Sequence, residues 1–168
     1  MAVLQVNRVS KTFEDEQIIK EISLELQEGE IVSLLGVSGG GKTTLFNIIA
    51  GLSVPDTGNV CLAGEDITGK PGKVSYMLQK DLLLPYKTIA DNVALPLVIR
   101  GMKKKEAREQ ALKYFDEFGL AGTEDKYPAQ LSGGMKQRAI IAMALACNAE
   151  ILIADEQRLP LMLLFKLK

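Results

Sequence analysis

The fold of this chain is decided at residues 36–44, which read Gly36-Val37-Ser38-Gly39-Gly40-Gly41-Lys42-Thr43-Thr44. This stretch fits the pattern G-x-x-x-x-G-K-[ST], a loop whose backbone N–H groups surround nucleotide phosphates. Residues 30–35 predict a buried strand entering the loop, and residues 43–50 predict a helix leaving it, with Gly51 placed to end the helix. Such a strand, loop and helix form an anion site because unpaired N–H groups and the helix dipole both face the anion. The alternative is a glycine-rich surface turn.

Length and composition restrict the function classes. With 168 residues, of which 47% are hydrophobic, the chain can bury one substantial core, as one domain or one domain plus a small lobe. The net charge is −1 with dispersed basic residues, so nothing indicates a nucleic-acid partner, and the Lys103-Lys104-Lys105 run predicts a solvated helix face. Cys61 and Cys147 stand far apart and favour buried thiols in a reducing compartment. Residues 1–6 lack a signal-peptide pattern and no segment approaches the ~20 apolar residues of a membrane span, so we expect a soluble, cytoplasmic chain.

Further strands are expected on both sides of the loop. Residues 2–7 and 18–26 alternate apolar and polar side chains, and residues 73–78 form another short run, so each of them predicts a strand. Phe13 stands in a polar setting between the first two, where an aromatic side chain acts either as a hydrophobic plug or as a stacking surface for a purine ring. Gln79 closes the run at 73–78. A polar residue at that place in an open α/β sheet points into the ligand crevice, and the alternative is a solvent-facing loop residue.

The second half of the chain has a helical pattern that leads to another glycine pair. Residues 88–131 are mostly helical and are followed by Leu131-Ser132-Gly133-Gly134-Met135-Lys136-Gln137-Arg138 and an apolar helix at residues 139–147. Ser132 is a good N-cap, and two glycines in the first turn leave backbone N–H groups unshielded. This helix start is therefore either an ordinary capped helix or a second phosphate-binding N-terminus.

An apolar strand ending in two carboxylates follows at Ile151-Leu152-Ile153-Ala154-Asp155-Glu156. A buried parallel strand delivers its last residues to the crevice edge of the sheet. At that edge Asp155 can hold Mg²⁺ through water, and Glu156 can polarise a water molecule. A generic surface acid pair is the alternative, which the glycine loop upstream disfavours.

The ordered set GVSGGGKT, Gln79 after a strand, LSGGMKQR and ILIADE resembles the ATP-binding-cassette (ABC) ATPases over residues 2–156. It looks most like the nucleotide-binding subunit of a bacterial importer of the nitrate, sulfonate or thiamine-precursor type. Residues 139–147 look closer to oligopeptide importers, so the cargo stays open. The resemblance implies an α/β fold with a P-loop NTPase (RecA-like) core, an N-terminal antiparallel β lobe, and a helical signature-motif lobe at about residues 88–135. Residues 1–156 would form a partial ABC ATPase domain.

The resemblance also implies ATP and Mg²⁺ as cofactors and a role for each matched residue. Phe13 would stack on adenine, Lys42 would contact the β- and γ-phosphates, and residues 132–134 would bind the γ-phosphate of the other subunit's ATP. The implied catalytic residues are Lys42, Gln79 and Glu156. The implied metal-binding residues are Thr43, Gln79 and Asp155. The implied nucleotide-binding residues are Phe13, Gly36, Ser38, Gly39, Gly40, Gly41, Lys42, Thr43, Thr44, Ser132, Gly133 and Gly134.

Partners follow from the same resemblance. Two ABC subunits would pair and clamp two ATP molecules at their interface. A membrane permease subunit would dock on residues 79–91, a solute-binding protein would act indirectly, and no nucleic acid is expected. The chain would lie in the cytoplasm, peripheral on the inner face of the cell membrane. A non-transport ABC protein of DNA repair or translation is less favoured, because the tandem cassettes or long insertions of such proteins are absent from this sequence.

The chain departs from the family after Glu156. The family continues with a proline, a loop aspartate, a further strand and a histidine, whereas residues 157–168 read QRLPLMLLFKLK and the chain has no histidine. Deleting one C from one coding sequence for the family-like E-P-T-T-A-L-D-V-T-I-Q gives E-Q-R-L-P-L-M-L-L-F-K, which matches residues 156–166 at every position. We therefore hypothesise that residues 157–168 are a frameshifted tail and that the last strands and helices of the cassette are missing.

This loss has physical consequences. We expect the parallel sheet to lose a member and expose an edge, which residues 161–165 either patch or turn into an aggregation site. We also expect weaker nucleotide binding and strongly impaired hydrolysis, because the family's histidine contacts the γ-phosphate. A nucleotide-binding fragment with little or no ATPase turnover is therefore the alternative to an active importer subunit.

Overall fold

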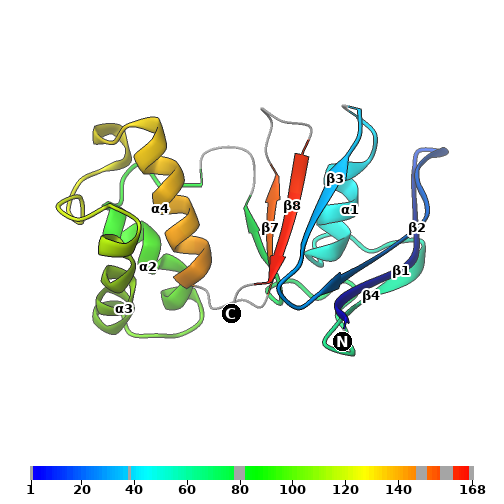
Figure 1. Cartoon of the computed structure of the whole chain (residues 1–168), viewed down its shortest axis with the longest axis horizontal. Helices are drawn as coiled ribbons and strands as arrows, with labels where there is room; N and C mark the ends of the chain where they lie inside the picture. Colours follow the sequence, from blue (N-terminus) through cyan, green and yellow to red (C-terminus); the bar gives the residue numbers. More distant parts are fainter. Residues whose placement is uncertain (1, 38, 78–81, 147–150, 156–160, 167–168) are drawn as a thin grey trace. The chain divides into compact units, whose positions relative to one another are not determined.

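The computed structural model describes residues 2–37, 39–77, 82–146, 151–155 and 161–166 (Figure 1). Two compact units make up the chain. Met1–Gln79 and Ala149–Lys168 form the first, here named the sheet unit, and Lys80–Asn148 form the second, here named the helical unit. None of the helices in the described residues is long and apolar enough to cross a membrane.

The sheet unit contains two four-stranded sheets and one helix. The first sheet is antiparallel, with the order β2-β1-β4-β5, and the second has the order β3-β8-β7-β6. Its elements are β1 (Ala2–Phe13), β2 (Glu16–Gln27), β3 (Ile31–Leu35), α1 (Lys42–Ile49), β4 (Thr57–Leu62), β5 (Glu65–Asp66), β6 (Ser75–Met77), β7 (Ile151–Asp155) and β8 (Leu161–Lys166).

The β1–β2 hairpin is longer than its alternating pattern predicts. β1 continues through the polar run after residue 7 and ends at Phe13, which pairs with Glu16. Glu14 and Asp15 make the turn with φ values of 45° and 67°. A two-residue hairpin turn with positive φ at both positions usually has Asn-Gly, Asp-Gly or Gly-Gly, so Glu14-Asp15 carries no ordinary sequence signal for this turn.

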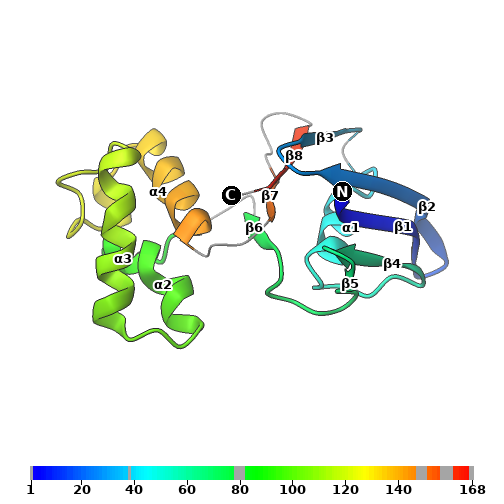
Figure 2. The ribbon, with the colours of Figure 1, turned by 60° about the horizontal axis from the view of Figure 1, so that its bottom comes forward.

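One core holds the sheet unit together. α1 packs its apolar side of Leu45, Phe46, Ile48 and Ile49 into it (Figure 2). Side chains from both sheets join the same cluster, including Leu4, Val6, Val60, Ile151 and Ile153. Because β7 contributes residues to this core, the apolar strand predicted at residues 151–155 is buried as expected. Cys61 of β4 is free and half-buried rather than fully buried, and Cys147 lies outside the described residues.

β8 occupies the place where the sequence predicts an unpaired edge. It lies between β3 and β7 and runs antiparallel to both, whereas β6 and β7 pair in parallel. Leu35 of β3 pairs with Leu161, and Asp155 of β7 pairs with Met162. The expected gap between β3 and β7 is therefore filled, because the apolar run satisfies the backbone hydrogen bonds of both neighbours.

The helical unit buries small residues between its helices. Its elements are α2 (Ile89–Ile99), α3 (Lys104–Glu117), the short 3₁₀ helix η1 (Pro128–Gln130) and α4 (Gly133–Ala146). Ala107, Ala111, Ala139 and Ala142 are fully buried, which lets the helix backbones approach closely. Among the aromatic residues of α3 and its C-terminal end, Phe115 is buried, whereas Tyr114 and Phe118 are half-buried.

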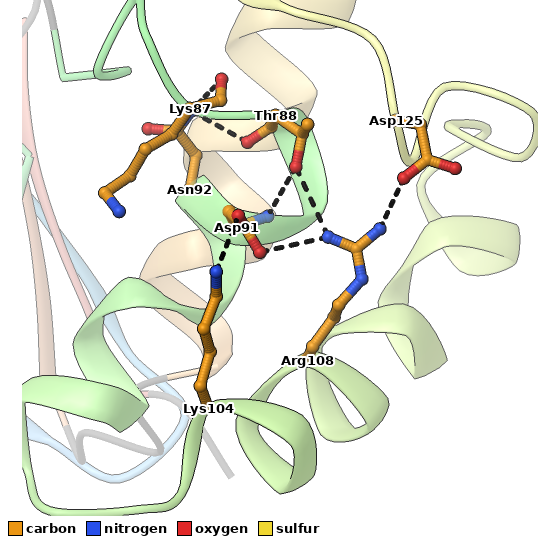
Figure 3. A network of polar contacts seen from close by, with 7 residues as sticks. All are labelled: Lys87, Thr88, Asp91, Asn92, Lys104, Arg108 and Asp125. Atoms are coloured by element: carbon orange, nitrogen blue, oxygen red, sulfur yellow. Dashed lines mark hydrogen bonds and ion pairs between the residues drawn. The ribbon is translucent and has the colours of Figure 1, made fainter.

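Asn92 of α2 fixes the segment that precedes the helix (Figure 3). Its Nδ2 donates to the carbonyl oxygens of Leu84, Lys87 and Thr88 at 3.1, 3.1 and 3.0 Å, and its Oδ1 accepts from the Leu84 N–H at 2.7 Å. Asn92 is fully buried, so these bonds are shielded from water. The segment before α2 therefore has a defined conformation that depends on one side chain.

Arg108 of α3 joins three parts of the helical unit (Figure 3). One guanidinium nitrogen is 3.0 Å from Asp91 Oδ1 and the other is 2.6 Å from Asp125 Oδ1, while Lys104 Nζ is 3.4 Å from Asp91 Oδ2. Thr88, the N-cap of α2, accepts a hydrogen bond from the Asp91 N–H. Burial raises the pKa of Asp91, but the Arg108 hydrogen bond and the Lys104 charge outweigh burial and hold that pKa below its ordinary value.

Candidate nucleotide-binding site

The glycine loop lies between β3 and α1, as the sequence predicts (Figure 1). Gly39 and Gly41 both have a φ of +81°, in the left-handed region that glycine adopts without strain. The Gly40 N–H donates to the Val37 carbonyl at 3.1 Å and closes a tight turn. Gly41 is the N-cap of α1 and supplies no side-chain cap. The start of α1 therefore presents backbone N–H groups that no capping side chain covers.

Lys42 bends back over this loop. Its Nζ donates to the carbonyl oxygens of Gly36 at 2.6 Å and Val37 at 2.7 Å. Thr43 and Thr44 follow in the first turn of α1, and Thr43 is exposed. An ammonium group, bare N–H groups and a hydroxyl therefore gather on one short segment, which is the donor set that suits a polyphosphate.

The end of the β1–β2 hairpin lies beside the loop. A Cβ atom on Gly41 would come within 2.9 Å of the Ile18 carbonyl oxygen, so only glycine fits there without displacing β2. Ile18 is two residues from Glu16, the partner of Phe13. The structure thus brings Phe13 to the neighbourhood of the glycine loop, although more than twenty residues separate them in the sequence.

The Phe13 side chain is not a hydrophobic plug. It is 48% exposed, and the Lys11 ammonium lies 5.4 Å from the centroid of its ring. Lys11 in turn forms an ion pair with Asp56. The sequence reasoning missed both residues. The position of Lys11 beside Phe13 could have been predicted, since residues two apart on a strand share a face. The contact with Asp56 could not, because Asp56 is 45 positions from Lys11 in the sequence.

Asp155, at the end of β7, lies on the same side of the sheet as the end of β3, the strand that enters the loop. Met162 of β8 pairs with Leu34 of β3 on one side and with Asp155 on the other. The backbone of Asp155 is therefore two strand spacings, about 10 Å, from that of Leu34. The sequence predicts an apolar strand at residues 151–156; the structure describes it as far as Asp155, the last residue of β7.

Ser132 stands directly before α4, in the helical unit. Its Oγ accepts from the Met135 N–H at 3.3 Å, the bond expected of an N-cap serine. Gly133 and Gly134 begin the helix, are exposed, and have open space where a Cβ would lie. The start of α4 is therefore capped by one hydroxyl and otherwise bare.

Three residues of the predicted site, Ser38, Gln79 and Glu156, lie outside the described residues. Within the part of the chain that the structure describes, no three or more His, Cys, Asp or Glu side chains gather as a metal site.

Comparison with known proteins decides the family. A family model described as ABC transporter matches residues 19–158, which is most of the chain. The chain belongs to the ABC transporter family. The ABC transporter ATP-binding protein YtlC of Bacillus subtilis (strain 168), itself uncharacterized, is 42% identical over 160 residues, covering 93% of this chain and 62% of YtlC.

Two further ABC proteins illustrate the likeness. The formylaminopyrimidine import ATP-binding protein ThiZ of Halalkalibacterium halodurans is 46% identical over 139 residues, covering 83% of this chain and 53% of ThiZ. The dimeric post-hydrolysis structure of the ATP-binding cassette MJ0796, bound to ADP and Pi, has a TM-score of 0.76 and 34% identity, over 90% of this chain and 73% of that cassette. The chain spans only about half to two thirds of the length of the curated relatives it matches. The ABC ATPase fold, with an antiparallel β lobe and a helical region, is confirmed.

Proposed function

We propose that this chain binds ATP at the glycine loop, as the nucleotide-binding part of an importer-type ABC transporter. The observation that carries the proposal is the Lys42 ammonium folded over a loop whose helix start is uncapped, in a member of this family. A phosphate oxygen competes well with the Gly36 and Val37 carbonyls for Lys42, because a charge-assisted hydrogen bond is stronger than one to a neutral acceptor. The N–H groups of Gly39 and of residues 41–44 would contact the remaining phosphate oxygens.

The other site residues fit the rest of a nucleotide and its metal. The exposed Phe13 ring would stack on the adenine base. Thr43 and Asp155 offer the hard oxygen donors that Mg²⁺ prefers, and both belong to the glycine-loop edge of the sheet unit. Gln79 would complete this set, and Glu156 would orient water. Mg²⁺, when bound, supplies charge neutralisation on the β- and γ-phosphate oxygens.

The proposed partners are a second ABC subunit, a membrane permease subunit and, indirectly, a solute-binding protein. The start of α4 supports the first, because Ser132, Gly133 and Gly134 leave a helix N-terminus open to an anion from outside the chain. The relative MJ0796 is dimeric in its ADP-bound structure. We propose that the second subunit's nucleotide meets this helix start, and that the permease docks on residues 79–91 at the inner face of the membrane. No nucleic acid is involved in this proposal.

A second candidate function, nucleotide binding with little or no turnover, is favoured by the direction of β8. Because β8 runs antiparallel to β7, its last residue, Lys166, pairs with Ile151, at the edge of the sheet opposite Asp155. If the strand in this position ran parallel to β7, the residues that follow it would lie at the end of the sheet next to the glycine loop. We propose that residues 1–156 are a partial cassette and that residues 157–168 are a frameshifted tail whose strand direction lowers turnover.

Calorimetric titration of the 168-residue chain with Mg²⁺–ATP, together with a phosphate-release assay, tests both candidates. We expect Lys42→Met to weaken ATP binding at least about tenfold, since one charged hydrogen bond contributes about 1.5–3 kcal/mol. The matched control is Lys113→Met, an exposed lysine of α3, which should leave binding unchanged. Absence of ATP binding, or equal binding by Lys42→Met, would refute the first proposal. Sustained phosphate release by the unmodified chain would refute the second.

A further inference from the structure

The positively charged ammonium group of Lys11 lies over one face of the Phe13 ring. Lys11 and Phe13 are two residues apart on β1 and share a face of the strand. The Lys11 Nζ lies over the ring, 5.4 Å from its centroid, within the range of a cation–π interaction. The Lys11 side chain is only 18% exposed, so its ammonium is largely withdrawn from water. Partial desolvation strengthens a cation–π contact, because the ring then competes with fewer water molecules.

Asp56 holds this arrangement in place. Its Oδ1 accepts from Lys11 Nζ at 2.9 Å, and its Oδ2 accepts from the Thr12 N–H at 2.7 Å. The Asp56 N–H donates to the Ser10 carbonyl at 2.9 Å. The Lys11 hydrogen bond, followed by the Thr12 N–H, lowers the pKa of Asp56, so the carboxylate stays charged at neutral pH. One residue thus clamps both the Lys11 side chain and the backbone between Lys11 and Phe13.

We propose that Lys11 is a positioning residue for nucleobase recognition, which covers one face of the Phe13 ring and leaves its exposed surface to a single purine-type base. This inference rests on the proposed ATP-binding function. A ring with one face occupied by an anchored ammonium cannot turn that face to solvent, so its orientation is set before a base arrives. The ammonium also draws electron density toward the covered face, which favours stacking of an electron-rich purine on the other.

The charge of Lys11 is already compensated locally. Its ammonium pairs with the Asp56 carboxylate, so the pair adds little net charge with which to attract phosphates from a distance. Lys42, by contrast, bonds to neutral carbonyl oxygens. Loss of the Lys11 charge should therefore affect recognition of the base, whereas loss of the Lys42 charge should affect recognition of the phosphates.

Titration of the full chain with ATP and with inorganic tripolyphosphate, which has the phosphates but no base, separates these two contributions. We expect Lys11→Met to weaken ATP binding about two- to fivefold, the equivalent of about 0.5–1 kcal/mol for a cation–π contact, while tripolyphosphate binding stays unchanged. Lys11→Arg keeps the cation and should restore ATP binding. Lys20→Met, at an exposed position of β2, is the matched control and should change neither affinity.

Each outcome bears on the proposal. Equal weakening of both ligands by Lys11→Met, or no effect on either, overturns it. Phe13→Ala should weaken ATP binding alone, and if it does not, the base is not held at Phe13 and the inference falls while phosphate binding stands. If the unmodified chain binds neither ligand, the proposed function itself fails. Should Lys11→Met not fold, Lys11→Gln removes the same charge, keeps a hydrogen-bond donor for Asp56, and must show the same selective loss.

Discussion

Replacement of Asn92 by alanine should destabilise the helical unit severely. The Asn92 side chain is 0% exposed and takes part in four hydrogen bonds with the main chain of Leu84, Lys87 and Thr88. Alanine removes all four bonds without offering a substitute. The segment before α2 then either keeps its conformation with unpaired polar groups or moves to let water reach them.

The magnitude follows from the number of bonds and their surroundings. Each hydrogen bond contributes about 1 kcal/mol net, so contacts to four main-chain groups contribute up to about 4 kcal/mol, and less where the two Nδ2 hydrogens are shared among three carbonyls. The three partner residues are half-buried, so some of their carbonyl groups regain water and the loss falls to about 2–4 kcal/mol. For a chain of this size, that corresponds to a decrease in Tm of about 5–15 °C.

Urea denaturation followed by far-UV circular dichroism measures the loss, and hydrogen exchange locates it. Exchange should accelerate in residues 82–99 of Asn92→Ala while β1 and β2 keep their protection. Asn7→Ala is the control, since Asn7 is exposed and its side chain donates one hydrogen bond, to Asn59. If Asn92→Ala costs less than about 1 kcal/mol, or no more than Asn7→Ala, the role assigned to Asn92 is wrong.

Three further predictions concern the backbone, an ion pair and the last strand. Gly58→Ala should cost several kcal/mol more than Gly64→Ala in thermal unfolding, because both glycines have φ near +83° but only a Cβ on Gly58 would collide with the backbone of β1. The pKa of Asp91 is lowered in the folded state, so its contribution to stability is present at neutral pH and is lost as the pH falls below about 4. The urea midpoints of the unmodified chain and Asp91→Asn should therefore differ at pH 7, and the difference should shrink as the pH falls below about 4. Leu163→Pro should destabilise the sheet unit by about 3 kcal/mol or more, because Leu163 lies mid-strand between β3 and β7, and an unchanged Tm would show that β8 does not pair there.

Much of the fold follows from local signals. The strand before the glycine loop, the helix after it and the apolar strand expected at residues 151–156 lie where the pattern places them, because each combines a hydrophobic run with a glycine or charged boundary. The strand before the loop was expected to be buried, and that was wrong, since Ile31 and Leu35 of β3 are exposed. The extension of β1 to Phe13 was not predicted. Residues 12–17 at the end of the hairpin are all exposed, so alternation no longer marks a buried face there.

The direction of β8 could not be predicted from the sequence. An apolar run with high β propensity indicates a strand, but direction depends on which neighbours offer free hydrogen-bonding groups. β8 has β3 on one side and β7 on the other, over a hundred residues apart in sequence. The expectation of an exposed edge here was therefore wrong. Of the two outcomes expected for residues 161–165, a patch over the gap or an aggregation site, the structure shows the first.

Some parts of the candidate site can be predicted from a local motif, whereas others depend on contacts between residues far apart in the sequence. The glycine loop and Lys42 are contiguous, so one motif predicts both. The contacts that place Phe13 are not contiguous, since its hairpin approaches the loop through Ile18 and Gly41 and its ring is held through Asp56. A motif search finds Phe13 as a candidate, but only the structure shows what orients it.

Binding and hydrolysis depend on different parts of this chain, and this leads to a specific expectation for its activity. Phe13, Lys11 and Asp56 belong to β1 and the turn before β4, whose sheet contains no residue of the tail, and Lys42 belongs to a helix buried in the same core. β8, in contrast, belongs to the second sheet, where it lies between β3 and β7 and pairs with Asp155 at the end of β7. Nucleotide affinity should therefore survive the altered last strand better than turnover does. A chain that binds ATP selectively over tripolyphosphate and yet releases no phosphate is the behaviour this arrangement predicts.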